Sequence, residues 1–381
     1  MFRDWASTYY LKLEELGFKI KKRFNAHTPT IAMANGFRII VRGERQVALE
    51  EFVCDEGNVE EDSVVVRNFY TMISPGTELS IYTGVDPLVH VSGSWCEYPF
   101  RPGYTGVGEV VAKGSNVDDA DVGDMVVCNS HHASFDKLSN KTSFWVKEMS
   151  NVEPVSALLS HFASIALVSL NVSSVKAGDT VALFGLGLIG QFVAQLLNLI
   201  GVQVLAFDPV HGRRRVAEQI GACKKIFDPK QSDPEDEIFA FTGGRGADAS
   251  VDAVGDSSVI LEASKMVRER GEIILLGTPR TPFTVDVTPF FRRVHLNWLT
   301  ITGALHGGPQ RGYFPLKPQT PQSESLVGNV TRCLRLIGEG KLKTRELISC
   351  VMLPKNIREA YECLLNRKDT CIGVVLDWTH S

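Results

Sequence analysis

The segment from Thr180 to Asp208 constrains the fold more than any other part of the chain. It reads TVALFGLGLIGQFVAQLLNLIGVQVLAFD, in which two apolar runs flank a stretch with helical spacing and three glycines follow the first run. A strand, a glycine turn, a helix, a second strand and a terminal acid are the order of a dinucleotide-binding βαβ unit. Gly185 permits the tight turn, Gly187 lets the backbone approach a pyrophosphate, and Gly190 lets the helix lie close on the strand. A glycine turn that serves packing alone is the alternative, but the flanking strands and the acid favour a nucleotide site.

Composition restricts the classes of protein to which the chain can belong. Its 381 residues suffice for two to three domains, each with its own core. A net charge of −4 gives no reason to expect nucleic acid or an anionic membrane as a partner. No apolar run reaches the length of about 18 residues that a membrane span needs, and the N-terminal segment lacks the apolar core of a secretory signal. We therefore expect a cytoplasmic protein that acts on a small-molecule substrate.

The eight cysteines show the pattern of neither a metal site nor a disulfide framework. No two of them are spaced as CxxC, and a protein without an export signal keeps its thiols reduced. They are therefore interpreted as free, buried thiols. The cysteines are Cys54, Cys96, Cys128, Cys223, Cys333, Cys350, Cys363 and Cys371.

Before the glycine segment, the chain has the pattern of a small β domain. Residues 4–23 carry apolar side chains three to four positions apart, which predicts an amphipathic helix that packs on the body or on a partner subunit. From Arg38 the pattern changes to short strands separated by Gly, Asn and Asp, which predicts a compact β domain to about residue 150. The expected strands cover residues 37–43, 46–53, 63–73, 106–114 and 124–130.

Around and after the glycine segment, helices and strands alternate. An apolar helix is predicted over residues 156–170, and the alternation that follows indicates a doubly wound α/β sheet to about residue 300. Its later elements are expected as strands at 225–229, 249–255 and 272–277 and a helix at 257–270. A Gly/Pro-rich loop at 303–321 follows, and its length suggests a functional or mobile segment. Two helices at 325–339 and 355–366 and a strand at 372–378 complete the chain.

Several sequence blocks resemble the medium-chain dehydrogenase/reductase superfamily, the relatives of alcohol dehydrogenase. They lie between residues 37 and 378 and include PGYTGVGEVVAKGSNV at 102–117, KAGDTVALFGLGLIG at 176–190 and GADASVDAVG at 246–255. The resemblance implies an α/β fold that joins a GroES-like β-barrel domain to a Rossmann domain with a doubly wound parallel sheet, with the substrate cleft between them. The implied divisions are an N-terminal helical extension at 1–36, a GroES-like catalytic domain at 37–155, a Rossmann domain at 156–302 and a C-terminal segment at 303–381 that returns to the catalytic domain.

The chain departs from the zinc-containing members of that superfamily. Those members bind a catalytic metal through an early cysteine, a Gly-His-Glu triplet and a later ligand. Here the triplet reads GYT at 103–105, and the early region offers Ser74 or Pro75. A catalytic zinc needs three protein ligands chosen from Cys, His and carboxylate, whereas only Glu78 and His161 remain near these positions. The sequence therefore predicts no metal, and it resembles the zinc-independent branch, with a distant similarity to bacteriochlorophyllide dehydrogenases.

Without a metal, a side chain must handle the proton during hydride transfer. Tyr104 stands where a metal ligand stood, so its phenol is expected in the cleft, with packing inside the β domain as the alternative. His161 could relay a proton or be a core histidine on its apolar helix. His132 belongs to a segment similar to one in which a histidine of the superfamily faces substrate. The other candidates for the polar lining are Ser74, Thr77 and Glu78, the last of which is alternatively a buried structural acid.

The cofactor is predicted to be NAD, with NADP as the alternative. Asp208 at the end of the second strand should accept hydrogen bonds from the adenosine ribose and repel a 2′-phosphate. Arg213 lies close enough to bind that phosphate instead. Val254, Gly277 and Thr278 end later strands, and the resemblance implies contacts with the ribose and nicotinamide. The residues predicted to hold the pyrophosphate are Gly185, Leu186, Gly187, Leu188, Ile189 and Gly190.

These patterns together predict a zinc-independent, NAD(P)-dependent oxidoreductase with a biosynthetic role. Its substrate would be a small or medium organic alcohol and the corresponding ketone or aldehyde. Reduction of an activated C=C bond, as quinone and enoyl reductases of the superfamily perform, is an alternative, and a nucleotide-binding protein with little catalysis is another. A strand at 296–305 falls where members of the superfamily pair their sheets across a two-fold axis, so a homodimer is expected.

Overall fold

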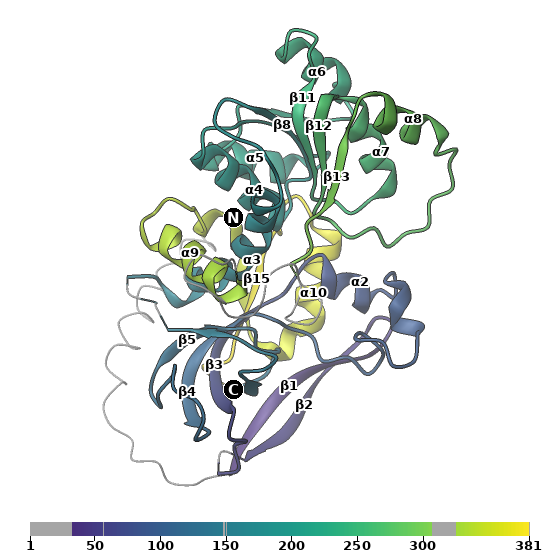
Figure 1. The fold of residues 1–381 in the computed structure, drawn as a ribbon. Coiled ribbons are helices and arrows are strands. Elements are labelled where there is room, and N and C mark those ends of the chain that lie inside the picture. The colour runs from purple at the N-terminus through teal and green to yellow at the C-terminus, as the bar shows by residue number, and fades with distance from the viewer. Residues whose placement is uncertain (1–32, 56, 148, 150, 307–324, 381) are drawn as a thin grey trace, which may run out of the picture.

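The computed structural model describes residues 33–55, 57–147, 149, 151–306 and 325–380. Two bodies lie one above the other (Figure 1): a sheet with helices on its faces, in teal and green, and a β-rich body, in purple and blue. The helix expected at 4–23 lies outside the described residues, as does most of the loop expected at 303–321. The two bodies correspond to the two patterns of the sequence, short strands first and βα alternation second.

The β-rich body contains the short strands that the sequence predicts. A hairpin of β1 and β2 forms a separate antiparallel sheet, and β1 buries Ile39 and Val41 on one face by the period-two rule. The larger sheet has the strand order β14-β15-β3-β4-β5-β7, with β6 also paired to β3. The elements here are β1 (Met33–Gly43), β2 (Gln46–Asp55), β3 (Ser63–Met72), α2 (Thr77–Tyr82), η1 (Pro87–His90), β4 (Gly106–Lys113), β5 (Met125–Cys128), β6 (Phe135–Ser139) and β7 (Trp145–Val146).

The last part of the chain returns to this β-rich body. The strand β15 pairs antiparallel with β3 and parallel with β14, so the chain ends inside the larger sheet. The two helices and the final strand that the sequence predicts in this region are confirmed to within a few residues. The elements are α9 (Leu326–Gly338), η2 (Arg345–Leu347), β14 (Cys350–Met352), η3 (Pro354–Asn356), α10 (Ile357–Asn366) and β15 (Val374–Asp377).

The second body is a six-stranded sheet in which every neighbouring pair is parallel. Its order, β10-β9-β8-β11-β12-β13, reverses direction between β8 and β11, which is the switch point of a doubly wound sheet. The predicted α/β class is therefore confirmed. The elements are β8 (Thr180–Phe184), α4 (Leu188–Leu199), β9 (Gln203–Phe207), α5 (His211–Ile220), β10 (Lys225–Phe227), α6 (Pro234–Phe241), β11 (Ala247–Asp252), α7 (Ser257–Lys265), β12 (Val267–Leu275), α8 (Thr288–Leu296) and β13 (Thr300–Gly303).

One prediction for this sheet is wrong in detail, and one of its helices was not predicted. The helix expected to reach residue 270 ends at Lys265, because β12 already begins at Val267. The register of β12 shifts beside Ala247, and Arg270 has a φ of 60° at the irregularity, so a charged run of helical character is drawn into a strand. The helix α8, which precedes the edge strand β13, was not predicted.

The helix α3 (Pro154–Asn171) joins the two bodies. It packs against α4 of the parallel sheet, against α9, and against β3 and β4 of the larger sheet. Within the described residues it is the one helix long and apolar enough to cross a membrane, yet 67% of it is buried inside the protein. Its core cluster includes Tyr70 and Val107 from one body and Val181 and Leu183 from the other. The helix therefore has the environment of a core helix, and it fixes the two bodies relative to each other.

Candidate functional site

The glycine loop between β8 and α4 is shaped for a phosphate group. Gly185 has a φ of 93°, and its N–H donates to the carbonyl of Phe207 at 2.9 Å. A Cβ on Gly190 would lie 1.9 Å from the carbonyl oxygen of Gly185, so the helix could not begin this close to the turn with any other residue. Around Gly187, by contrast, the nearest atoms to an added Cβ are those of the Arg213 guanidinium, at 3.9 Å. The space beside Gly187, at the N-terminus of α4, therefore fits a dinucleotide pyrophosphate.

The remaining residues of the loop have packing roles. Leu186 and Leu188 are buried in the core that joins the two bodies, and Ile189 is half-buried against it. Because these side chains pack inside the protein, the loop offers a ligand its backbone N–H groups, except those of Gly185 and Leu186, which already donate to Phe207 and Asp208. The six residues predicted to hold the pyrophosphate lie together in this loop and the first turn of α4.

Asp208 lies at the end of β9 with its carboxylate already engaged. One oxygen accepts from the N–H of Leu186 at 2.7 Å, and the other accepts from the N–H of Val210 at 2.7 Å. Nη1 of Arg213 lies 3.7 Å from the carboxylate, whereas its Nε has no hydrogen-bond partner among the described residues. The two groups predicted to contact the adenosine ribose or its phosphate, the Asp208 carboxylate and the Arg213 guanidinium, therefore both lie at the glycine loop.

The loops after β11 and β12 meet at the carboxyl edge of the sheet. A Cβ on Gly255 would lie 2.6 Å from the carbonyl oxygen of Thr278, and a Cβ on Gly277 would lie 2.2 Å from the nitrogen of Gly255. The carboxylate of Asp252 accepts from the N–H of Val254 at 2.9 Å and so fixes this crossing. Val254 is 51% exposed and Thr278 is also exposed, which leaves both side chains free at the edge where such sheets bind their ligands.

A close backbone crossing fixes Tyr104 in the β-rich body, where it packs against the core that joins the two bodies. Gly103 has a φ of 99°, and a Cβ there would lie 2.4 Å from the nitrogen of His132. The Tyr104 hydroxyl donates to Oγ of Ser74 and also bonds with the Thr77 side chain. Burial raises the pKa of Tyr104 to about 12, an effect that the Ser74 hydrogen bond opposes and the Glu78 charge reinforces. At neutral pH the phenol is therefore a proton donor.

One histidine ring adjoins Tyr104, and a second histidine ring adjoins the first. The ring of His161 lies edge-on to Tyr104 with centroids 5.4 Å apart, and the ring of His306 lies 5.2 Å from His161. Burial lowers the pKa of His161 well below its usual value and the neighbouring His306 lowers it further, so the ring is neutral. Nδ1 of His161 has no hydrogen-bond partner within the described part of the chain, while Nε2 of His306 lies 3.0 Å from Oγ of Ser164. An orphaned nitrogen beside Tyr104 is a free contact point for a ligand.

His306 is a site residue that sequence reasoning missed. It follows β13, and burial lowers its pKa to about 4. Its signal was present in the sequence, since a histidine directly after a strand of a parallel sheet lies at the carboxyl edge. The motif reasoning treated it only as part of the loop at 303–321.

Arg280 is a second residue that sequence reasoning missed. It follows β12, yet its Nε donates at 3.0 Å to Oδ2 of Asp86, which lies after α2 in the other body. The two side chains are 19% and 8% exposed, so the ion pair is largely shielded from water. The Arg280 charge also lowers the pKa of Tyr104, which places it beside the same cluster. The ion pair therefore connects the carboxyl edge of the parallel sheet directly to the β-rich body, which carries Tyr104.

Two predicted lining residues belong instead to a buried network, which corrects our expectation. Nε2 of His132 lies 2.9 Å from Oε2 of Glu78, and Nδ1 lies 2.8 Å from Oγ1 of Thr71. Oε2 of Glu78 also accepts from the Tyr361 hydroxyl at 3.1 Å, and Oε1 accepts from the N–H of Ser74 at 2.9 Å. His132 is 0% and Glu78 is 2% exposed. With every polar atom paired and no exposed surface, His132 is unsuited to exchange a proton with substrate, and Glu78 takes its alternative role as a buried structural acid.

The donor set does not fit a catalytic zinc ion. Near Tyr104, the side chains Ser74, Thr77, His161 and His306 offer two hydroxyls and two imidazoles, of which only the imidazoles are common zinc ligands. Across the described ranges, there is no group of three or more His, Cys, Asp and Glu side chains that could hold a metal ion.

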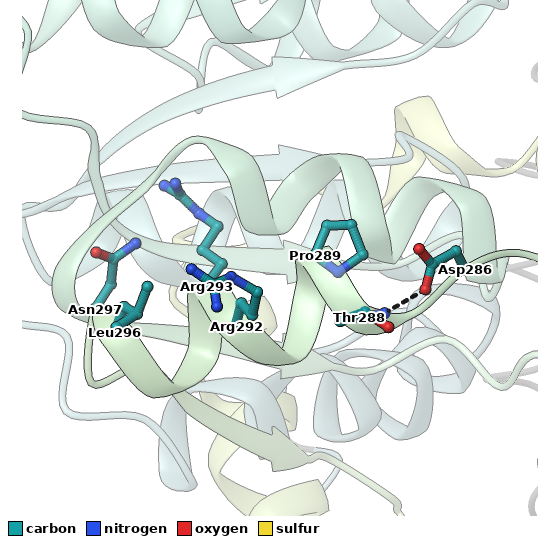
Figure 2. A pocket seen from close by; sticks show the side chains of 7 residues that line it. All are labelled: Asp286, Thr288, Pro289, Arg292, Arg293, Leu296 and Asn297. Atoms are coloured by element: carbon teal, nitrogen blue, oxygen red, sulfur yellow. Dashed lines mark hydrogen bonds between the residues drawn. The ribbon is translucent and has the colours of Figure 1, made fainter.

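A pocket of about 450 Å³ lies beside α8 (Figure 2), and no residue of the Tyr104 cluster lines it. It contains none of the residues predicted for the site. Arg293 in its wall donates to the carbonyls of Ser264 and Val267 and so ties α8 to the sheet. The lining is Asp286, Thr288, Pro289, Arg292, Arg293, Leu296 and Asn297.

Comparison with known proteins shows relatives over most of the chain. Residues 189–316 match the family described as zinc-binding dehydrogenase. The chain is 25% identical over 293 residues to an L-threonine 3-dehydrogenase from Caldanaerobacter subterraneus, which covers 64% of this chain and 83% of that protein. It is also 25% identical over 343 residues to a D-guloside 3-dehydrogenase from Shigella flexneri, covering 85% and 94% of the two chains.

Solved structures share the fold at low sequence identity. A 2R,3R-butanediol dehydrogenase from Bacillus subtilis superposes with a TM-score of 0.73 at 19% identity, over 90% of this chain and 99% of the other. A zinc-binding dehydrogenase from Sinorhizobium meliloti bound to NADP superposes over the same shares of the two chains, with a TM-score of 0.70 at 17% identity. An alcohol dehydrogenase from Escherichia coli complexed with NADH does so with a TM-score of 0.72 at 18% identity. These similarities confirm the expected combination of a GroES-like domain and a Rossmann domain.

Proposed function

We propose that this chain, whose relatives are dehydrogenases of the alcohol dehydrogenase-like superfamily, is an oxidoreductase that interconverts a small or medium organic alcohol and its ketone or aldehyde without zinc. The observation that carries the proposal is the place of Tyr104. Its protonated phenol contacts the ring of His161, which in turn contacts the ring of His306 after β13, and the charge of Arg280 after β12 acts on the phenol. The strands β13 and β12 end at the carboxyl edge of the Rossmann sheet, which is where a nicotinamide ring binds in this fold.

The residues at the glycine loop and the sheet edge fit NAD(P), which supplies or accepts the hydride when bound. The loop around Gly187 receives the pyrophosphate, and the neighbouring strand ends with Val254 and Thr278 line the nicotinamide side. Both cofactor forms occur in structures of the same fold. We favour NAD because the Asp208 carboxylate faces the loop where the adenosine ribose would lie, and a 2′-phosphate would meet that charge.

The preference for NAD has a direct measurement. The ratio of kcat/KM for NADH to that for NADPH should exceed one, and Arg213→Ala should leave NADH turnover closer to normal than NADPH turnover. A ratio below one that rises above one in Arg213→Ala would show that Arg213 binds a 2′-phosphate and that NADP is the cofactor.

Tyr104 is the proposed proton donor to the carbonyl oxygen during reduction. Its raised pKa keeps the phenol protonated, and the hydroxyls of Ser74 and Thr77 remain beside its oxygen to stabilise the charge that develops as the proton leaves. His161 and His306 are neutral and form the adjoining wall, where the free Nδ1 of His161 can hydrogen-bond the substrate.

Substitution of Tyr104 tests this role against a matched control. Tyr104→Phe should lower kcat by about 10²- to 10⁴-fold, the usual contribution of general acid–base catalysis. Tyr70 has its pKa raised to about 12 by burial but lies in the core, so Tyr70→Phe should keep normal turnover. Near-normal turnover of Tyr104→Phe would remove Tyr104 from the mechanism.

Independence from zinc is supported by the donor set around Tyr104, which lacks three ligands of the kinds that zinc prefers. Purified protein should contain well below one equivalent of zinc per chain, and dialysis against a chelator should leave turnover unchanged. One tightly held equivalent whose removal abolishes activity would overturn this part of the proposal.

Reduction of an activated C=C bond is the second candidate reaction. A phenol donor without a metal serves that chemistry as well, and a quinone oxidoreductase from Pseudomonas syringae shares the fold with a TM-score of 0.69 at 18% identity. Product analysis with an α,β-unsaturated ketone separates the two reactions. An allylic alcohol supports our proposal, and a saturated ketone supports the alternative.

We also propose that two copies of the chain pair through β13. This strand is the edge of the sheet, and in the described residues its only partner is β12. Large apolar side chains lie exposed around it, with Trp298, Leu296 and Leu305 at 65%, 58% and 57%. An exposed edge strand with an apolar flank pairs readily with its own copy about a two-fold axis. Light scattering should give twice the chain mass of 42.0 kDa, and Ile301→Lys should give the single mass.

A further inference from the structure

Three thiols lie together in the β-rich body, away from the cluster around Tyr104. Cys350 begins β14, Cys363 lies in α10, and Cys371 precedes β15. Cys371 is a member of an apolar core cluster, and Cys350 and Cys363 pack against that cluster. All three are free cysteines, and neither the glycine loop nor the Tyr104 cluster uses them. The sequence alone gave no reason to group them, because the outer two lie 21 positions apart.

Backbone hydrogen bonds hold Cys350 and Cys371 side by side. Strands β14 and β15 are parallel, with Cys350 in register with Val374. Oγ of Ser349 accepts from the N–H of Ile372 at 2.7 Å, and the N–H of Ser349 donates to the carbonyl of Gly373 at 2.8 Å. The residues adjoining both cysteines are therefore bonded to each other, and the Cys350 and Cys371 side chains share a hydrogen bond.

The two thiols differ in exposure and in acidity. Cys350 is half-buried, whereas Cys371 is only 2% exposed. The hydrogen bond from Cys371 lowers the pKa of Cys350, although burial and the charge of Glu359 act in the opposite direction. The same contact raises the pKa of Cys371, together with burial and a further contact from Cys363. A half-buried thiol whose pKa is lowered, next to a buried thiol whose pKa is raised, is the arrangement of an attacking and a resolving cysteine.

We propose that Cys350 and Cys371 form a peroxide-sensitive dithiol site, in which Cys350 is oxidised first and Cys371 resolves it to a disulfide. The Cys350 thiolate attacks hydrogen peroxide, so the O–O bond breaks, hydroxide leaves and a sulfenic acid forms. The Cys371 sulfur then displaces the sulfenic oxygen, which leaves as water. In sum, two thiols are oxidised and one peroxide is reduced to two waters. The site is independent of the proposed dehydrogenase reaction.

Backbone and side-chain hydrogen bonds link the region of this dithiol to the segment that carries Ser74. The carbonyl of Val374 accepts from the N–H of Ile73, the residue before Ser74. Cys363 shares α10 with Tyr361, which donates to Glu78. A disulfide at Cys371 would therefore form next to β15 and α10, the two elements whose hydrogen bonds to Ile73 and Glu78 position Ser74.

Peptide mapping after peroxide treatment tests the proposal. Fully reduced protein is treated with hydrogen peroxide, quenched with N-ethylmaleimide and digested. We expect a linked Cys350–Cys371 peptide, a loss of two thiols that dithiothreitol reverses, and loss of Cys350 at least tenfold faster than loss of Cys223. Cys223 is the internal reference, because it is also half-buried but burial raises its pKa to about 12. A Cys363–Cys371 link, or equal rates for Cys350 and Cys223, would overturn the assignment.

Two variants make the order of steps testable. In Cys371→Ser, dimedone should trap a sulfenic acid at Cys350, because the resolving thiol is gone. Cys223→Ser is the matched control and should form the same disulfide as the unsubstituted protein. If Cys371→Ser does not fold, Cys350→Ser replaces it, and Cys371 should then survive peroxide as a free thiol. Trapping at Cys371 rather than Cys350, or oxidation of Cys371 without Cys350, would contradict the proposed order.

Discussion

Replacing Glu78 by Gln is the sharpest test of the buried hydrogen-bond network around this side chain. The Glu78 side chain accepts three hydrogen bonds, from the Ser74 N–H, from Nε2 of His132 and from the Tyr361 hydroxyl. The change keeps the shape of the side chain but replaces one acceptor oxygen by an NH₂ group. The Ser74 bond can survive, whereas the NH₂ group would face the other two donors.

The loss of stability depends on whether the Tyr361 hydroxyl and the His132 ring can accept a hydrogen bond from the new NH₂ group. The Tyr361 hydroxyl can turn to accept from the amide. His132 can accept only by moving its proton to Nδ1, which then donates to Oγ1 of Thr71, an atom that already accepts from the Trp378 indole at 2.8 Å. The Thr71 hydroxyl proton is then left without an acceptor. One charge-assisted bond contributes about 1.5–3 kcal/mol and an unsatisfied buried donor costs about 1–3 kcal/mol, so we expect Glu78→Gln to lower the free energy of unfolding by about 3 kcal/mol.

Urea unfolding followed by tryptophan fluorescence measures this change, and a double-mutant cycle isolates the network. Tyr361→Phe removes one donor and should cost about 1–2 kcal/mol on the same principle. The double variant should cost less than the sum, because both changes affect one network. A loss of unfolding free energy below about 1 kcal/mol, with additive effects of the two changes, would refute the buried network. A large loss of turnover at unchanged stability would show that Glu78 takes part in catalysis.

Three further outcomes follow from the structure. The pKa of Tyr104 is raised to about 12 and that of His306 is lowered to about 4, so the phenol stays protonated and the imidazole stays neutral around neutral pH. We therefore expect kcat for reduction to be flat from about pH 6 to about pH 9. A change of kcat with a midpoint near neutrality would implicate another group. Gly190→Ala should abolish NADH binding, measured by cofactor fluorescence, because its Cβ would lie 1.9 Å from a carbonyl oxygen, whereas Gly43→Ala, with only the Gln46 side chain near at 3.7 Å, should bind normally. Asp86→Ala should lower the free energy of unfolding by about 3–5 kcal/mol, because it removes the carboxylate that pairs with the shielded Arg280 charge. The exposed Lys113–Asp121 pair is the control, and Asp121→Ala should leave stability unchanged.

The local pattern of the sequence was enough to predict the glycine loop and the parallel sheet. Turn geometry at Gly185 and close packing at Gly190 depend on residues a few positions apart, and period-two and helical spacing are properties of single segments. For the same reason the short strands and most helices lie where they were expected. The boundary between α7 and β12 failed because the Arg268 to Arg270 run has helical propensity, and pairing with β11 overrides it.

Contacts between distant segments were beyond that reasoning. Nothing in the sequence relates His132 to Glu78 and Thr71, so a fully paired histidine was taken for a substrate-facing one. Likewise, Arg280 meets Asp86 across 194 positions, and His306 meets His161 only after the sheet and α3 are in place. The sequence by itself determined that a dinucleotide loop, an α/β sheet and a β-rich domain are present, because these follow from local steric and apolar patterns. Only the tertiary structure decided which polar side chains share the space around Tyr104, because burial and hydrogen-bond pairing are set by chain segments that the fold brings together.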